Sequence, residues 1–243
     1  MLLAFVPLLL AGYGIFGAAP VATAGAPGAV AVVELFTSEG CSSCPPADAL
    51  LREIGRSAAA VGAPVHCLSF HVDYWNGLGW PDPFSSEAAT RRQRRYSPDG
   101  RVYTPQMVVN GKAAFVGSNA SSARSALADA LGRAAPHQVR IEGVAVKAGV
   151  AAVRFRVQPA PPPGSTVLVA LTEDGLEVDV PRGENAGETL RHDHVVRAFQ
   201  IIPGAEAGAA ELPVPNDLRP ADAHVIVIAE AKGGTLGAAA RRL

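Results

Sequence analysis

The chain has 243 residues, of which 49% are hydrophobic and 18% charged, and its formal net charge is -1. This length and apolar content support a well-buried core in one large domain or two small ones. Nucleic acid and anionic lipid both bind proteins through clustered positive charge, which a nearly neutral chain does not offer in general. We therefore expect neither as a partner.

Residues 1–24 have the pattern of a signal peptide. Leu2 to Phe16 is an almost uninterrupted apolar run, and Ala22-Thr23-Ala24 matches the small-residue cleavage site of exported proteins. No Lys or Arg precedes the run, which departs from the usual signal, and an uncleaved membrane anchor is the alternative. We predict a mature chain that begins near Gly25, a periplasmic or secreted location, and no stable membrane span after cleavage.

The first predicted elements are a buried strand and a helix that flank a pair of cysteines. Residues 29–36 are β-rich and almost continuously apolar, as in a central strand covered on both faces. Cys41-Ser42-Ser43-Cys44 follows, and Pro45 opens a segment with apolar residues at helical spacing up to Ile54. The pattern predicts a strand, a cysteine loop and a helix.

Residues 65–131 contain the remaining predicted elements of the first domain. We predict a second, parallel strand over residues 65–70, helices over 85–96 and 121–131, and a hairpin whose turn is Asn110-Gly111. The order β-α-β-α-β-β-α is that of a thioredoxin fold, and it predicts a thioredoxin-like domain over residues 25–135.

Beyond Pro136 only strand patterns remain. They cover residues 139–146, 151–157, 167–171, 195–201 and 225–229, and residues 159–164 form a turn between two of them. Short strands at such spacing are typical of an antiparallel sandwich. The fold class we predict is thus α/β, with a separable all-β, sandwich-like accessory domain over residues 136–243.

Cys41 and Cys44 are candidate catalytic residues because a helix N-terminus stabilises a thiolate. Cys41, which precedes the helix, would be exposed and attack a substrate disulfide, and Cys44 would resolve the mixed disulfide from within the first turn. A zinc site needs a second pair of ligands, and no second CxxC is present. Cys67 lies in the second predicted strand, where we expect it to be a small buried core residue.

Four stretches of the sequence resemble known proteins. Residues 32–44 are similar to the active-site segment of glutaredoxins and thioredoxins. ELFTSEGCSSCPPAD (34–48), FHVDYWNGLGWPDPFSS (70–86), VYTPQMVVNG (102–111) and GENAGETLRHDHVVR (183–197) resemble a secreted bacterial family known only as domain of unknown function 1223. This resemblance covers nearly all of the mature chain. It implies a thioredoxin-like fold and no established reaction.

The thioredoxin resemblance implies two further site residues, Thr104 and Pro105. The chain also departs from the thioredoxin pattern at one position. Thr104 and Pro105 match the pair that faces the redox loop in that superfamily, and Pro105 would be the cis-proline that shapes the substrate groove. Without the resemblance, a trans bond would be expected. Thioredoxins bury an acid six residues before the first cysteine; here Leu35 holds that place and Glu34 precedes it.

His71, Asp73, Tyr74 and Trp75 follow the second strand at the sheet edge from which the cysteine loop emerges, so they are candidate substrate-binding residues. Cys41, Cys44 and His71 could alternatively hold copper, which thiolate and imidazole ligands suit. Plain packing of His71 in its loop is a third interpretation.

Two other charged motifs have mainly structural interpretations. Arg91, Arg92, Arg94 and Arg95 end a predicted helix, where cations complement the helix dipole. The sequence His192-Asp193-His194 places two imidazoles on one face of a strand, but no third metal ligand accompanies them.

These patterns predict an exported thiol-disulfide oxidoreductase that uses the CSSC pair. Its partner would be a thiol- or disulfide-containing protein or a small thiol, and we expect no cofactor. The alternatives are a non-catalytic binding module in which Cys41 and Cys44 form a structural disulfide, and copper delivery.

Overall fold

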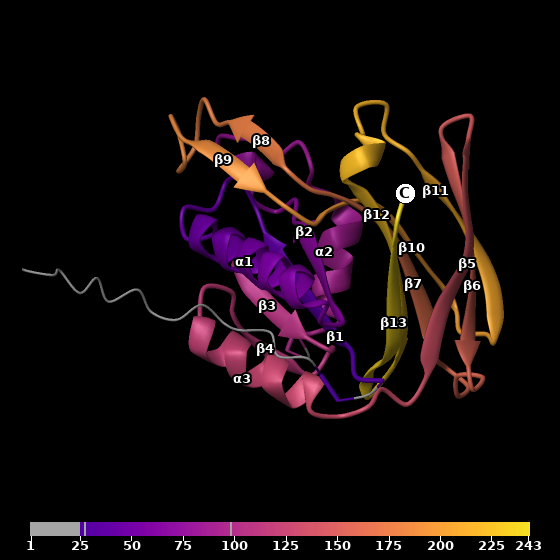
Figure 1. Ribbon diagram of the computed structural model, residues 1–243. Coiled ribbons are helices and arrows are strands. Elements are labelled where there is room, and N and C mark those ends of the chain that lie inside the picture. Colours follow the sequence, from indigo (N-terminus) through magenta and orange to yellow (C-terminus); the bar gives the residue numbers. More distant parts are fainter. Residues whose placement is uncertain (1–24, 27, 98) are drawn as a thin grey trace, which may run out of the picture.

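The computed structural model describes residues 25, 26, 28–97 and 99–243 (Figure 1). The fold is α/β, with one large mixed sheet and three α-helices in this part of the chain. The predicted signal peptide lies outside the described residues. Among the described residues, the helices are too short or too polar to cross a membrane.

The first part of the chain follows the predicted element order. Its elements are β1 (Ala31–Thr37), α1 (Pro45–Val61), β2 (Val65–His71), the 3-10 turn η1 (Asn76–Leu78), α2 (Glu87–Arg94), β3 (Gln106–Val109), β4 (Ala113–Val116) and α3 (Ala120–Leu131). The predicted hairpin is confirmed, and its turn residues Asn110 and Gly111 have φ values of 49° and 66°. Pro45 and Pro46 open α1, and Gly62, with φ of 64°, ends it.

The second part contains more strands than the sequence predicts. Its elements are β5 (Gln138–Lys147), β6 (Val150–Gln158), β7 (Thr166–Glu173), β8 (Leu176–Asp179), β9 (Thr189–His192), β10 (Val195–Pro203), β11 (Ala207–Pro213), η2 (Pro220–Asp222), β12 (Ala223–Ala231) and β13 (Gly234–Arg242). The five predicted strands are all present. The strands β8, β9, β11 and β13 were not predicted.

One sheet contains strands from both parts of the chain. Its order is β13-β12-β7-β10-β2-β1-β3-β4. The junction is the parallel pairing of β10 with β2, where Val195 stands opposite Ser69 and the Ser69 N–H donates to the His194 carbonyl (2.7 Å). The prediction of separable halves that meet near Pro136 is therefore wrong for the sheet. The β-rich segment extends the sheet of the first part, and three of its strands, β5, β6 and β11, form a second sheet that packs on this extension.

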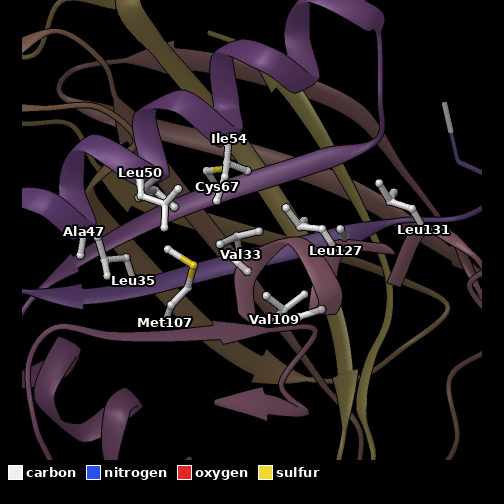
Figure 2. Packing of buried hydrophobic residues seen from close by; sticks show 14 of the residues in the cluster. Val33, Leu35, Ala47, Leu50, Ile54, Cys67, Met107, Val109, Leu127 and Leu131 are labelled. Carbon is white, nitrogen blue, oxygen red and sulfur yellow. The ribbon is translucent and has the colours of Figure 1, made fainter. Parts of the chain in front are cut away.

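Both faces of the large sheet are covered. On one face, α1 and α3 pack on β1, β2 and β3 around a cluster that includes Leu35, Ile54, Cys67 and Met107 (Figure 2). Cys67 is a free, buried thiol in this cluster, as predicted, and burial raises its pKa. The opposite face carries α2 and a second cluster with Phe36 and Phe70 stacked at 5.5 Å.

The strands β5, β6 and β11 form a separate three-stranded sheet that packs on β7 and β12. Alternating residues of β6, with Val153, Phe155 and Val157 fully buried, supply its inner face. This packing buries the alternate residues of β7 that α2 does not cover. The small sheet therefore supports the distal half of the large sheet.

The strands β8 and β9 pair only with each other and form a hairpin-like arm over residues 176–192, which lies next to α1 (Figure 1). The arm leaves the large sheet after β7 and returns to it at β10. At its base, the Gly175 N–H donates to the Asp193 carboxylate and the His194 N–H donates to the Asp174 carboxylate, both at 2.7 Å. The arm thus brings distant sequence to the start of α1.

Candidate functional site

The candidate site is centred on Cys41 and Cys44, at the point where β1 has ended and α1 begins. Their sulfur atoms lie at disulfide-bonding distance, and their Cα atoms are 5.5 Å apart. Cys44 is the N-cap of α1 and accepts backbone hydrogen bonds from Ala47 and Asp48. The predicted arrangement of strand, cysteine loop and helix is confirmed.

Both cysteines are fully buried, with relative exposures of 0%. The prediction that Cys41 is exposed and Cys44 shielded is therefore wrong for this oxidised form. Ser42 and Ser43 form the exposed surface of the loop, and the Ser43 hydroxyl lies 3.4 Å from the Cys41 sulfur. Direct attack on either sulfur requires the covering residues to move.

The tip of the arm covers the cysteine loop through two consecutive side chains. The Glu184 carboxylate accepts hydrogen bonds from the N–H (3.0 Å) and the hydroxyl (2.7 Å) of Ser42. The buried Asn185 amide donates to the carbonyls of Glu39 (2.7 Å) and Cys41 (3.2 Å). These bonds link backbone groups of the loop to residues more than 140 positions later.

Trp75, Thr104 and Pro105 lie on another side of the same loop. Trp75 donates from its indole N–H to the Thr104 hydroxyl (2.8 Å), and it packs against Gly40, the residue before Cys41. The Thr104–Pro105 peptide bond is cis, as predicted. Pro105 lies beside Ala47, in the first turn of α1, across the small space left by Gly117. Trp75 therefore borders the loop, and Thr104 and Pro105 lie close to Trp75 and to the start of α1.

Beneath the loop lies a buried polar cluster made by Glu39, Asp48, His71, Asp82 and His192. His71 shares a hydrogen bond between Nδ1 and the Asp82 carboxylate (2.7 Å), and the same carboxylate accepts from the Glu39 N–H (2.8 Å). The Glu39 carboxylate lies 3.2 Å from His192 Nε2. The imidazole rings of His71 and His192 pack edge to face with their centroids 4.8 Å apart.

Burial and neighbouring charges shift the pKa values of His71, Asp82 and Asp48 in this cluster. Burial alone would lower the pKa of His71, but the adjacent Asp82 carboxylate outweighs it, so the pKa of His71 is raised and that of Asp82 is lowered. Burial raises the pKa of Asp48, although the two histidines and the Thr37 hydroxyl act in the opposite direction. Of the two aspartates, Asp48 is therefore the one whose protonated form burial favours.

Several polar atoms of the cluster are buried without a hydrogen-bond partner. Among the described residues, Asp48 Oδ1, His71 Nε2 and His192 Nδ1 have no partner, and Glu39 Oε1 and His192 Nε2 have none besides their 3.2 Å contact with each other. A pocket of about 240 Å³ between α1 and β9 is lined by Asp48 and His192, with Arg52 and Glu188 among its other lining residues. Such a polar pocket can admit water to the unpartnered groups.

The other predicted substrate-binding residues have structural contacts. His71 is buried inside the polar cluster, so it does not line an open groove. Asp73 accepts a hydrogen bond from the Thr90 hydroxyl (2.6 Å), which ties the loop to α2. Tyr74 donates from its hydroxyl to the side chain of Gln93 on the same helix (3.2 Å). Only Trp75 of the four borders the cysteine loop directly.

Glu34 lies on the opposite face of the sheet from α1 and cannot serve the cysteines. It forms a buried ion pair with Arg92 and accepts a hydrogen bond from the Tyr96 hydroxyl (2.6 Å). Arg92 also bonds Glu230 on β12 (3.1 Å). One of the four predicted surface arginines, Arg92, is therefore a core residue that joins the two parts of the chain.

The proposed metal ligands are not brought together. Within the described part of the chain, no group of three or more His, Cys, Asp or Glu side chains has an arrangement that could hold a metal ion. Cys41, Cys44 and His71 therefore do not form the copper site considered from the sequence. His192 faces Glu39, whereas His194 has φ of 61° and pairs with Asp174, so these two imidazoles do not share a strand face.

Sequence reasoning missed the residues that the arm and the loop after β2 contribute. Glu39, Asp48 and Asp82 are isolated acids in the sequence, and Glu184 and Asn185 lie far from the cysteines. The available signal was the resemblance to the domain of unknown function 1223, whose stretches 34–48, 70–86 and 183–197 contain all five of these residues.

Comparisons with known proteins agree with that resemblance. A crystal structure of the protein AGR_C_4864 from Agrobacterium tumefaciens is 30% identical, covers 87% of this chain and 94% of its own, and has a TM-score of 0.60. A β-glucosidase from Kluyveromyces marxianus is 11% identical over 44% of this chain and 14% of its own, with a TM-score of 0.23, which is too low for any inference.

No curated protein matches the sequence. The family model described as "Protein of unknown function (DUF1223)" matches residues 32–230, which include both parts of the large sheet, the cysteine loop and the covering arm. The chain therefore belongs to the DUF1223 family.

Proposed function

We propose that the protein is an exported thiol-disulfide oxidoreductase with a thioredoxin-like arrangement around the CSSC loop. The observation that carries the proposal is the location of the Cys41–Cys44 pair, which begins α1 and lies directly above an ionisable, partly unpartnered polar cluster. A disulfide that only stabilises a fold needs no such cluster. The location outside the cytoplasm, predicted from residues 1–24, permits the pair to be oxidised.

The exchange reaction uses both sulfur atoms in sequence. A substrate thiolate attacks the Cys41 sulfur, the bond between Cys41 and Cys44 breaks, and Cys44 leaves as a thiolate that takes up a proton. The second substrate thiol then loses its proton and displaces Cys41. The substrate ends as a disulfide and the protein as a dithiol; in the reverse direction the Cys41 thiolate attacks a substrate disulfide.

Asp48 is the group best placed to exchange the proton of Cys44. It follows Cys44 by four residues on α1, so both side chains lie on one helix face one turn apart. Its Oδ2 accepts from the Thr37 hydroxyl (3.2 Å), Oδ1 has no partner among the described residues, and Asp48 is one of the residues that line the pocket beside β9. The raised pKa of Asp48 suits a group that both holds and releases a proton.

Trp75, Thr104 and Pro105 would form the wall against which a substrate lies. Trp75 lies beside Gly40 and bonds Thr104, and Pro105 lies near Ala47 in the first turn of α1. The substrate class that fits is a thiol or disulfide, in a protein or a small molecule.

The complete burial of both cysteines favours a second candidate function. A structural disulfide inside a binding module would also be fully buried and hydrogen-bonded on its outer side. The two candidates differ in whether the sulfurs exchange with an external thiol.

Trapping of mixed disulfides distinguishes the two candidates. With Cys44→Ser, the attacking Cys41 thiolate lacks its resolving partner, so adducts with substrate proteins accumulate and appear on a non-reducing gel. Cys41→Ser provides the matched control and gives none, and Cys67→Ser behaves like the parent chain. If folded Cys41→Ser and Cys44→Ser chains are both free of adducts, the disulfide is structural.

A further inference from the structure

The arm is held to α1 along β9, where Arg52 donates to the Arg191 carbonyl and pairs with Asp193 (3.4 Å). Its strands β8 and β9 pair with each other and with no strand of the two larger sheets. A residue with positive φ flanks each end, Gly175 at 68° and His194 at 61°, so the chain turns sharply where the arm leaves and rejoins the sheet. These features suit a segment that moves about its base.

The contacts between the arm tip and the cysteine loop are few and polar. Glu184 is exposed and binds Ser42, whereas Asn185 is buried and binds the carbonyls of Glu39 and Cys41. At the tip the backbone of Gly183 approaches that of Gly79, with no room for a side chain between them. The buried apolar residues of the arm, Val180 and Leu190, lie outside the tip at residues 183–185.

The backbone groups that the arm occupies match those of a polypeptide. Two carbonyls and one N–H of the loop are bonded by a carboxamide and a carboxylate, and an extended peptide offers the same donors and acceptors through its amides. We propose that the arm is a displaceable cover of the disulfide, latched by Asn185, and that an extended polypeptide carrying the substrate cysteine displaces it. This deepens the proposed function and rests on it.

Access to the disulfide can be measured without knowing the natural substrate. The oxidised full chain is mixed with dithiothreitol, whose first thiolate opens the disulfide and whose second thiol closes on the first to release both protein thiols. Acid quenching, alkylation under denaturing conditions and mass spectrometry give the rate. Asn185→Ala should increase this rate about tenfold, as expected for the loss of a buried hydrogen-bonding side chain.

Matched variants on the same arm keep the test decisive. Glu184→Ala removes the two bonds to Ser42 at an exposed position, so it should fold and give a smaller increase. Glu177→Ala removes an exposed carboxylate that pairs with Arg191 within the arm (2.8 Å), so it should leave the rate unchanged. If a folded Asn185→Ala chain, or Glu184→Ala should the first fail to fold, is reduced at the parent rate, the latch does not exist.

A reduced two-cysteine peptide of about ten residues tests the nature of the occupant. The peptide needs the backbone positions that the arm holds, whereas dithiothreitol needs only a path to sulfur. Asn185→Ala should therefore accelerate reduction by the peptide more than reduction by dithiothreitol. Equal acceleration would contradict a polypeptide occupant. Because these rates use an external reductant, they report on the cover even if trapping shows that the disulfide is structural.

Discussion

The side-chain amide of Asn185 donates a hydrogen bond to the backbone carbonyl of Cys41 (3.2 Å), although the two residues are 144 positions apart. This bond holds a residue of the second part of the chain against the cysteine loop of the first part. The β2–β10 junction below it makes the same connection within the sheet. The cysteine loop is therefore completed by residues from the end of the chain, and a fragment that stops near Pro136 would lack its cover.

Arg92 should be essential for stability. Replacing it with Met leaves the Glu34 carboxylate buried without its cation and Glu230 paired with Arg95 alone, which costs about 3–5 kcal/mol in the free energy of unfolding. The neighbouring Arg91 pairs with Glu87 in solvent, so Arg91→Ala should cost less than about 1 kcal/mol. Urea unfolding of the two variants checks the contrast, and equal losses would refute the account of the network.

Gly55 should tolerate no side chain because α1 packs there on the base of the arm. A Cβ atom at this position would overlap the imidazole of His194, with Cε1 at 2.9 Å. We expect Gly55→Ala to lower the free energy of unfolding by about 1–3 kcal/mol, although alanine is the better helix former. Gly77→Ala, where the added methyl meets open space, is the control for thermal unfolding. A stabilised Gly55→Ala chain would disprove this packing.

Asp48 should make stability fall as the pH rises. Its pKa in the folded chain is above the ordinary value of 3.8, so between these two pKa values the folded state binds more protons than the unfolded state. Stability is therefore lost as pH rises through that window and stays lower above it. Asp48→Asn cannot ionise and should gain stability over the parent chain above the window, with little difference below pH 3.8.

Urea unfolding at a series of pH values measures this difference. Asp99→Asn, at an exposed site, is the matched control and should follow the parent chain at each pH. A difference between Asp48→Asn and the parent that does not grow with pH would show that Asp48 does not hold its proton in the fold.

Local patterns in the sequence predicted the elements around the cysteines well. Three short motifs each predict their structure from a few residues, because capping, turn and burial preferences are local. They are the proline pair that opens α1, the Asn110-Gly111 turn and the apolar run of β1. The cis bond before Pro105 was predicted through the thioredoxin resemblance, since local preference favours trans.

The remainder of the site depends on pairings between distant residues. β13 is rich in Ala and Gly and has Thr235 as its single β-branched residue, so its pairing with β12 defines it. The insertion of β10 beside β2 is likewise invisible in either strand alone. The burial of Cys41 follows from Asn185 and Glu184, whose polar side chains are typical of any exposed turn.

The reduction potential of the Cys41–Cys44 pair tests the central claim most directly. The full chain is equilibrated with thiol-disulfide buffers of graded potential, and the dithiol fraction is measured by alkylation and mass spectrometry, with and without added copper. A disulfide that exchanges with substrates should have a potential above about -300 mV, and copper should leave the titration unchanged. A potential below about -300 mV would contradict the proposed oxidoreductase function and assign the disulfide a structural role.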